Sequence, residues 1–302
     1  MKYVGTRLKE EISVKELVSV HYFEFSKDYH FAGESHDFWE FLYVDNGELG
    51  IKSDGMEMKL KSGDMVIHKP DELHGQFADG VTAPSVVIFS FKSSSQVLES
   101  IGGRCFHMGN RQRTLISHIL EEAAKAFANP LDELYTKKLT RRENAPVGSE
   151  QLVKNYITEL LITILRDEAS PADSSLKRNV DSGLFADISA FMEERLGSKI
   201  SLDDIARFAG ISKTAVKQLF KEKVGCGACE FFTRMKIDRA KEYIREGNYN
   251  FTEIAELLGY DSIHYFSRQF KNYVKMSPTE YSGSIRALAD DAILFGKAGE
   301  SR

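Results

Sequence analysis

Two short segments in the N-terminal third contain residue types that can bind a metal ion or a small polar molecule. Glu34, His36 and Glu40 lie in the first segment, and His74 lies in the second. If residues 34–40 form a strand, the alternation of side chains places positions 34, 36, 38 and 40 on one face. Imidazole and carboxylate groups gathered there can ligate a metal, and they equally suit a small polar ligand in an otherwise apolar barrel.

The same segments carry glycines and prolines at fixed spacing. They read Gly33-Glu34-x-His36-x-x-x-Glu40-x-x-x-x-x-x-Gly47 and Gly63-Asp64…Pro70-x-x-x-His74. This pattern resembles the two cupin motifs, which belong to a small double-sheet β fold. Cupins often place a metal on three His and one Glu, but here Glu34 stands at the first His position. The resemblance implies a barrel that binds an effector, holds a metal, or is a structural remnant without a ligand.

The surrounding residues have the period of a β domain. From about residue 10 to 92, apolar and polar side chains alternate between turn signals. Residues 41–51 predict strand, turn and strand, and the following residues predict a hairpin around Asp54-Gly55. Further strand cores lie at 65–67 and 86–89. Many short strands with close turns indicate a barrel or sandwich, and Trp39 is expected to point into the layer opposite the polar face.

Helical spacing replaces this alternation after residue 111. Apolar residues recur at helical intervals in 115–123 and 152–165, and a charged stretch with two prolines separates them at 129–148. The sequence therefore predicts a multi-domain α+β chain: a cupin-like β-barrel with a helical hairpin, then an all-α C-terminal domain. The expected parts are a sensor barrel at 1–110, a helical segment at 111–170, a linker at 171–183, a helical domain at 184–286 and a tail at 287–302.

The C-terminal domain contains an internal near-repeat. Residues 202–210 (LDDIARFAG) resemble residues 251–259 (FTEIAELLG) at an offset of 49, and residues 219–221 match 269–271 at an offset of 50. The repeats contain cap residues, helix-ending glycines and aromatic anchors. These are Ser201 with Asp204, Gly210, Ser212 and Phe220, and then Gly259, Ser262 and Phe270. This layout predicts two helix-turn-helix units, so 184–286 is expected to be a tandem helix-turn-helix domain.

The second helix of each unit has an outer face that can contact double-stranded DNA. Arg and Lys can pair with guanine edges or phosphates, and Gln and His can meet base edges. The predicted DNA-binding residues are Lys213, Thr214, Lys217, Gln218 and Lys221 in the first unit, and His264, Tyr265, Ser267, Arg268 and Lys271 in the second. The alternative is a pair of solvated helical faces, but two tandem units with basic outer faces favour DNA.

A family resemblance follows from the second unit. Its residues read Ile254-Ala255-Glu256-x-x-Gly259-Tyr260-x-x-x-x-Tyr265-Phe266-Ser267-Arg268-x-Phe270-Lys271…Ser277-Pro278-x-x-Tyr281. This closely resembles the signature of the AraC/XylS transcription regulators, and Arg234-Met235-x-x-x-x-Ala240 resembles their linker helix. The match covers about 100 residues. Three departures occur: Lys275 stands at a usual Gly, Ser282 at a frequent Arg, and Cys226-Gly227-Ala228-Cys229 in a turn usually free of Cys.

The resemblance implies a bacterial regulator whose barrel binds an organic effector without a metal. On that basis Glu34, His36, Glu40 and His74 are assigned to effector binding, and no metal, cofactor or catalytic residue is assigned. Residues 150–168 resemble a helix that helps such regulators to dimerise, although plain packing against the barrel is the alternative. A homodimer and a contact with RNA polymerase are further expectations. Cys226 and Cys229 are read as incidental, with a redox switch as the alternative.

The composition and net charge limit these functional interpretations. The net charge of −5 argues against nucleic acid, but residues 181–286 hold 16 Lys and Arg against 15 Asp and Glu. Any DNA binding must therefore come from a local basic face. No apolar run approaches the ~18–20 residues of a membrane span, and three Cys suit a reducing cytoplasm. The remaining alternatives are a metal-binding cupin enzyme with an accessory DNA-binding domain and a regulator that needs no ligand; we expect no enzyme, because the first cupin His is missing.

Overall fold

The computed structural model describes residues 3–134, 136–169 and 180–285. Contacts divide the chain into an N-terminal unit that ends at residue 171 and a C-terminal unit of residues 172–287. Most of the predicted linker and the whole predicted tail, 287–302, lie outside the described residues. No helix among the described residues is long and apolar enough to cross a membrane.

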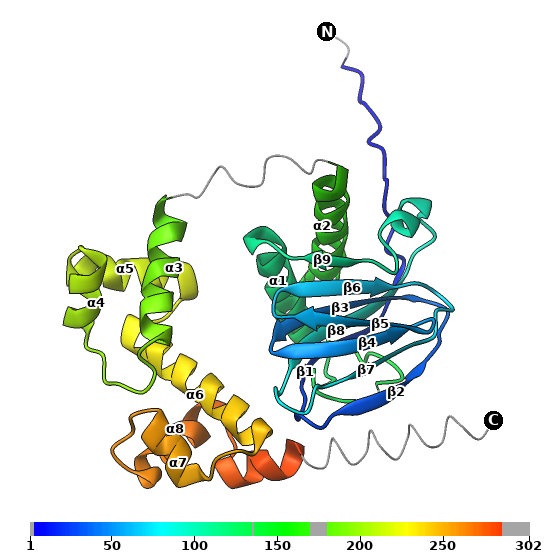
Figure 1. Ribbon diagram of the computed structural model, residues 1–302. Coiled ribbons are helices and arrows are strands. Elements are labelled where there is room, and N and C mark those ends of the chain that lie inside the picture. Colours follow the sequence, from blue (N-terminus) through cyan, green and yellow to red (C-terminus); the bar gives the residue numbers. More distant parts are fainter. Residues whose placement is uncertain (1–2, 135, 170–179, 286–302) are drawn as a thin grey trace. The chain divides into compact units, whose positions relative to one another are not determined.

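The N-terminal unit is built on two antiparallel sheets (Figure 1). One sheet has five strands in the order β1-β8-β3-β6-β9, and the other has four in the order β2-β7-β4-β5. The strands are β1 Glu16–Glu24, β2 His30–Glu34, β3 Trp39–Asn46, β4 Glu48–Ser53, β5 Met56–Lys61, β6 Asp64–His68, β7 His74–Phe77, β8 Ser85–Lys92 and β9 Cys105–His107. The predicted cupin-like double-sheet fold is therefore confirmed.

Two of the predicted turns have different roles. The turn at Asp54 and Gly55 closes the β4–β5 hairpin, with Ser53 opposite Met56 and positive φ of 45° and 80° at the turn residues. Two positive φ values match the right-handed strand twist, which explains the Asp-Gly pair. The turn at residues 45–48, by contrast, joins β3 to β4, which lie in different sheets. It carries the chain from one layer to the other, so residues 41–51 form a corner and not a hairpin.

Strand alternation divides the core into two layers. On β3, Leu42 and Val44 point between the sheets, whereas Phe41 and Tyr43 point to the outer face of the five-stranded sheet. Helices α1 (Asn110–Ala126) and α2 (Ser149–Ala169) contribute buried residues to that outer layer. Trp39 belongs to the same outer layer, as predicted, and its indole N–H donates to the Ser93 carbonyl at 3.3 Å. The space between the sheets holds a second apolar cluster, which includes Leu42 and Val44.

The described part of the C-terminal unit is built from helices joined by short turns. It comprises α3 Val180–Glu193, α4 Leu202–Ala209, α5 Lys213–Val224, α6 Ala228–Glu246, α7 Phe251–Leu257 and α8 Ile263–Val274, followed by helical residues 278–285. Helix α3 begins at 180, inside the segment predicted as linker, so the last residues of that segment are helical. The Ser, Asp and Pro content of this segment gave no sign of the helix start.

Candidate functional site

The two helix-turn-helix units begin with the same reciprocal cap. In α4, the Ser201 hydroxyl accepts the Asp204 backbone N–H, and the Asp204 carboxylate accepts the Ser201 N–H. In α7, Asn250 and Glu253 make the equivalent box. Each box satisfies backbone donors that the first turn of a helix leaves free. The first box was predicted from the sequence and the second was not, although Asn250 and Glu253 have the required types and spacing.

The turns and second helices repeat as predicted. Gly210 and Gly259 have left-handed φ values of 65° and 64°. Ser212 caps α5 by accepting the Ala215 N–H, and Ser262 caps α8 by accepting the Tyr265 N–H. The inner anchors of α5 and α8 are fully buried at Val216, Phe220, Phe266 and Phe270, whereas Leu219 is only half-buried. These contacts orient the opposite faces of α5 and α8 toward solvent.

The predicted DNA-binding residues lie on those outer faces. All ten are exposed except Ser267, which is half-buried. Lys213 forms an ion pair with Asp203, and the Lys221 ammonium donates to the Gly225 carbonyl at 2.9 Å. Lys217 has no ion pair among the described residues, and the Arg268 guanidinium lies 5.4 Å from the centre of the Tyr265 ring. Like Lys217, Arg268 and Lys271 have no ion pair in the described part of the chain, so these cations are available to a polyanion.

Helix α6 connects the two helix-turn-helix units and contacts α5, α7 and α8. Its Lys236 is 7% exposed, and the ammonium donates to the carbonyls of Ser198 at 2.8 Å and Leu258 at 2.7 Å. The Ser198 carbonyl lies in the loop between α3 and α4, and the Leu258 carbonyl lies at the end of α7. Burial lowers the pKa of Lys236. The Lys236 side chain therefore connects the loop before the first helix-turn-helix unit to the second helix-turn-helix unit. These hydrogen bonds help to fix the spacing between α5 and α8.

Cys226 lies in the turn before α6, and Cys229 is the second residue of that helix. Cys226 is buried, Cys229 is exposed, and both are free thiols. Cys226 takes part in the core as a small apolar residue. The burial of one thiol and the exposure of the other do not support a redox pair of Cys226 and Cys229.

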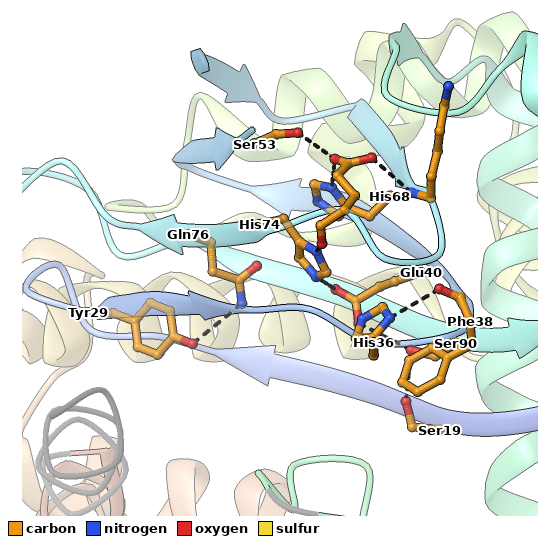
Figure 2. Close-up of polar contacts among 12 residues, drawn as sticks. Ser19, Tyr29, His36, Phe38, Glu40, Ser53, His68, His74, Gln76 and Ser90 are labelled. Atoms are coloured by element: carbon orange, nitrogen blue, oxygen red, sulfur yellow. Dashed lines mark hydrogen bonds and ion pairs between the residues drawn. The ribbon is translucent and has the colours of Figure 1, made fainter. Parts of the chain in front are cut away.

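In the N-terminal unit, the four predicted pocket residues do come together. The ligand atoms of Glu34, His36, Glu40 and His74 all lie within 4.8 Å of one another. Figure 2 shows His36, Glu40 and His74 pointing toward a common centre between the sheets. Nε2 of His36 is 3.6 Å from Oε2 of Glu40, and Nε2 of His74 is 3.5 Å from Oε1 of Glu40. We call these four residues the sensor cluster.

The way in which they meet differs from the prediction. The alternation of side chains predicted that positions 34, 36, 38 and 40 share one strand face, but β2 ends at Glu34 and β3 begins at Trp39. Residues 35–38 form a bend that crosses from the four-stranded to the five-stranded sheet. Glu34 and His74 face each other across β2 and β7, while Glu40 reaches the centre from the other sheet. The cluster is therefore made by the closure of the two sheets.

Charge in the cluster centres on Glu40, which is 8% exposed. Burial would raise the pKa of Glu40, but His36 and His74 outweigh burial and hold that pKa well below its usual range. Burial also acts on His74 by lowering its pKa, and Glu40 outweighs it, so the net pKa of His74 is raised. Burial raises the pKa of Glu34, and the charge on Glu40 adds to this. Glu40 is thus a buried anion that attracts positive charge to the centre.

A second polar group, which was not predicted from the sequence, lies behind His74 and holds it in place. The His68 ring stacks on the His74 ring with centroids 4.1 Å apart, and Nδ1 of His68 is 2.8 Å from the Glu72 carboxylate. The Glu72 carboxylate also accepts the Lys69 N–H and the Ser53 hydroxyl, while its backbone carbonyl accepts Nδ1–H of His74 at 2.9 Å (Figure 2). Despite burial, these donors lower the pKa of Glu72 to about 2.

A cavity of about 300 Å³ opens beside the sensor cluster. Glu34, Glu40 and His74 line one part of it. The remaining wall is largely aromatic and small, and includes Phe23, Tyr29, Phe31, Phe38, Gln76, Ile88 and Ser90. A few converging polar groups in an apolar wall are typical of a small-molecule site. A larger cavity of about 710 Å³ is lined by β1 and α2, and among the described residues its lining contains no cluster of potential metal ligands.

Comparisons with known proteins agree with both units. The family model for an AraC-like ligand binding domain matches residues 17–137, and that for a helix-turn-helix domain matches residues 205–284. The transcriptional activator AarP of Providencia stuartii is 31% identical over 116 residues, 38% of this chain and 86% of AarP. The uncharacterized regulator YfiF of Bacillus subtilis (strain 168) is 25% identical over 285 residues, 90% of this chain and 84% of YfiF.

Among solved structures, ToxT from Vibrio cholerae O395 is 14% identical with a TM-score of 0.35, and the likeness covers 89% of this chain and 97% of that chain. The relatives are named as transcription regulators. Its family models and its relatives agree with the two units described above. The chain belongs to the AraC family of DNA-binding transcription regulators and carries an AraC-like ligand-binding domain ahead of its helix-turn-helix domain.

Proposed function

We propose that this regulator senses a small-molecule effector in the cavity beside the sensor cluster and reads a specific DNA sequence with α5 and α8. The observation that carries the effector proposal is the convergence of Glu34, His36, Glu40 and His74, within 4.8 Å, at the edge of a 300 Å³ cavity. Burying polar groups such as Glu40 and His74 costs stability unless they are paired, so their presence in a ligand-binding domain favours a binding role.

DNA recognition is proposed for the outer faces of α5 and α8. The supporting features are the repeated caps and buried anchors, and the exposure of Lys217, Gln218, His264, Arg268 and Lys271. Two such units can place their second helices in successive major grooves, about 34 Å apart on one side of the duplex. The effector can act on DNA binding only if it has a different affinity for two states of the protein.

A homodimer, a contact with RNA polymerase and a cytoplasmic location complete the proposal. Helix α2 buries Ile157, Leu160 and Leu161 against its own barrel layer, which supports packing as one of its roles. Leu152 of the same helix is 37% exposed and is available to a second copy. Sedimentation equilibrium of the full chain and of a Leu152→Glu variant tests this: a dimer that the variant weakens supports α2 as the dimer surface, and an unchanged dimer argues against it.

The proposed function is tested by fluorescence anisotropy with the DNA upstream of the regulator's own gene and with a scrambled duplex. Both are titrated at about 50 and 200 mM salt, because nonspecific phosphate contacts weaken steeply over this range. We expect tighter binding to the upstream duplex that persists at the higher salt. Equal, weak binding to this duplex and to a panel of other promoter duplexes, with and without cell extract metabolites, would contradict sequence-specific reading.

The effector cavity is tested by filling it. Ser90→Leu introduces bulk at a residue that lines the cavity, and Ser117→Leu makes the same change on the exposed face of α1. Compounds are screened for those that change the affinity for the upstream duplex. We expect an active compound to work on the wild type and on Ser117→Leu but to lose its effect on Ser90→Leu. A compound that acts equally on all three proteins would place the effector site elsewhere.

A further inference from the structure

Two buried imidazole nitrogens in the sensor cluster lack a hydrogen-bond partner among the described residues. His36 directs Nδ1 to the Phe38 carbonyl at 3.1 Å, and His74 directs Nδ1 to the Glu72 carbonyl at 2.9 Å. A carbonyl only accepts, so each Nδ1 carries a proton, and in the neutral imidazole each Nε2 is then left with a lone pair. Both Nε2 atoms are buried and unpartnered. Their neighbours at the centre are carboxylate oxygens, which also only accept.

The distances identify what the centre lacks. The Nε2–Oε separations of 3.5 and 3.6 Å exceed the ~2.7–2.9 Å of a charge-assisted hydrogen bond. Ligands bound tetrahedrally at about 2.1 Å from one ion lie about 3.4 Å apart. The separations between Glu40 and the two imidazoles therefore match neighbouring ligands of a shared cation better than direct ion pairs. The largest separation, 4.8 Å, requires only a small side-chain movement to close on such an ion.

We propose that Glu34, His36, Glu40 and His74 bind a divalent first-row transition-metal ion. Two carboxylates balance the charge of a divalent ion, and two neutral imidazoles favour Mn²⁺ to Zn²⁺ over Mg²⁺ and Ca²⁺. The proposal rests on the proposed function of this cavity as a ligand site and names the class of one ligand. It departs from the organic effector without metal that the sequence resemblance implies, and the cavity still leaves room for such an effector beside the ion.

The surroundings of the cluster suit a metal site. The carbonyls of Phe38 and Glu72 fix the tautomer and direction of the two imidazoles, which is the usual support of histidine ligands. The Ser90 hydroxyl donates to Oε2 of Glu40 at 3.2 Å. The cavity lined by Glu34, Glu40 and His74 gives the ion a path to the centre. A metal ion would satisfy both unpartnered Nε2 atoms at once.

The test measures metal directly on untagged full-length protein. Protein stripped with a chelator is titrated with Co²⁺ and Zn²⁺, bound metal is counted by mass spectrometry, and the visible absorption of bound Co²⁺ reports its ligands. Glu34→Gln and His74→Asn each remove one ligand. Glu34 lies at an exposed position, so its variant is expected to fold. His30→Asn is the control, because His30 is an exposed imidazole on the same strand and outside the cluster.

We expect about one ion per chain, a Co²⁺ absorption band, and affinity at least about tenfold weaker in both ligand variants but unchanged in His30→Asn. Less than about 0.1 ion per chain with no band, or the same loss in His30→Asn, would overturn the proposal. The circular dichroism and Trp39 fluorescence of each variant report folding. The DNA titration is run on the same samples without added metal. Specific DNA binding without metal uptake would overturn only the proposed metal site. Metal uptake without specific DNA binding would overturn only the proposed function as a DNA-binding regulator.

Discussion

Gly225 and Lys275, fifty residues apart, end the two recognition helices with the same backbone. Gly225 ends α5 with φ 70° and ψ 0°, and Lys275 ends α8 with φ 67° and ψ 0°. The two turns are therefore alike, although Lys275 stands where the family resemblance has a usual Gly. A left-handed backbone costs a side-chain-bearing residue roughly 1–2 kcal/mol. Lys275 offsets part of this through its ammonium, which donates to the Asn272 carbonyl at 2.7 Å.

Replacing Lys275 with glycine should stabilise the C-terminal unit. We expect Lys275→Gly to raise its free energy of unfolding by about 1 kcal/mol, because glycine adopts the left-handed backbone without steric cost. Gly225→Ala is the matched change of opposite sign: nothing lies within 4 Å of the added Cβ, so only the backbone cost remains. Hydrogen exchange of α5 and α8 peptides in the full chain measures both. Two variants with equal exchange would show that this conformation carries no cost here.

Arg268 is predicted to contact a base edge. We expect Arg268→Ala to weaken binding to the specific duplex by ~1–3 kcal/mol, or about 5- to 150-fold, while binding to a scrambled duplex changes far less. Arg195→Ala is the control, since Arg195 is an exposed arginine outside the recognition helices. Fluorescence anisotropy on both duplexes checks the difference. An unchanged affinity for the specific duplex would remove Arg268 from the interface.

Lys217 is predicted to contact a phosphate. The loss of one phosphate contact should reduce the slope of log K against log salt by about 0.9. We therefore expect Lys217→Ala to flatten the slope for specific and scrambled duplexes alike. Lys59→Ala removes the same charge from the β4–β5 hairpin edge and should leave the slope unchanged. A wild-type slope in Lys217→Ala would mean that this side chain stays in solvent when DNA binds.

Lys236 is predicted to be the strongest single polar support of the C-terminal unit. Lys236→Met retains the aliphatic stem but leaves the Ser198 and Leu258 carbonyls without their donor. We expect a loss of about 2–4 kcal/mol in the free energy of unfolding, because charge-assisted bonds to buried acceptors are lost. Lys223→Met, at an exposed position of α5, should change it by less than about 0.5 kcal/mol. Hydrogen exchange of the backbone amides in α6 and α7 measures the difference between the two variants. Equal protection in both variants would contradict the role of Lys236.

The amino-acid sequence alone determined the helix caps and turns of the helix-turn-helix domain, because these features depend on local interactions. The Ser201 and Asp204 box, the Ser212 and Ser262 caps and the two helix-ending glycines involve residues within a few positions of one another. The Asp54-Gly55 hairpin is set in the same way by the backbone preferences of two residues. Short-range hydrogen bonds and φ values do not depend on the rest of the fold, so they can be predicted from the order of residues.

Only the tertiary structure decided the sensor cluster and its support. Residue types pointed to Glu34, His36, Glu40 and His74, but a strand through residues 35–38 was the wrong reason for their proximity, because the chain changes sheets there. Ser90 faces Glu40 only because β8 pairs with β3. His68 and Glu72 carried one weak signal, their spacing of four, whereas the stacking of His68 on His74 depends on how the two sheets close. Pairings between distant strands are fixed by the packing of the whole domain, and no short stretch of sequence contains them.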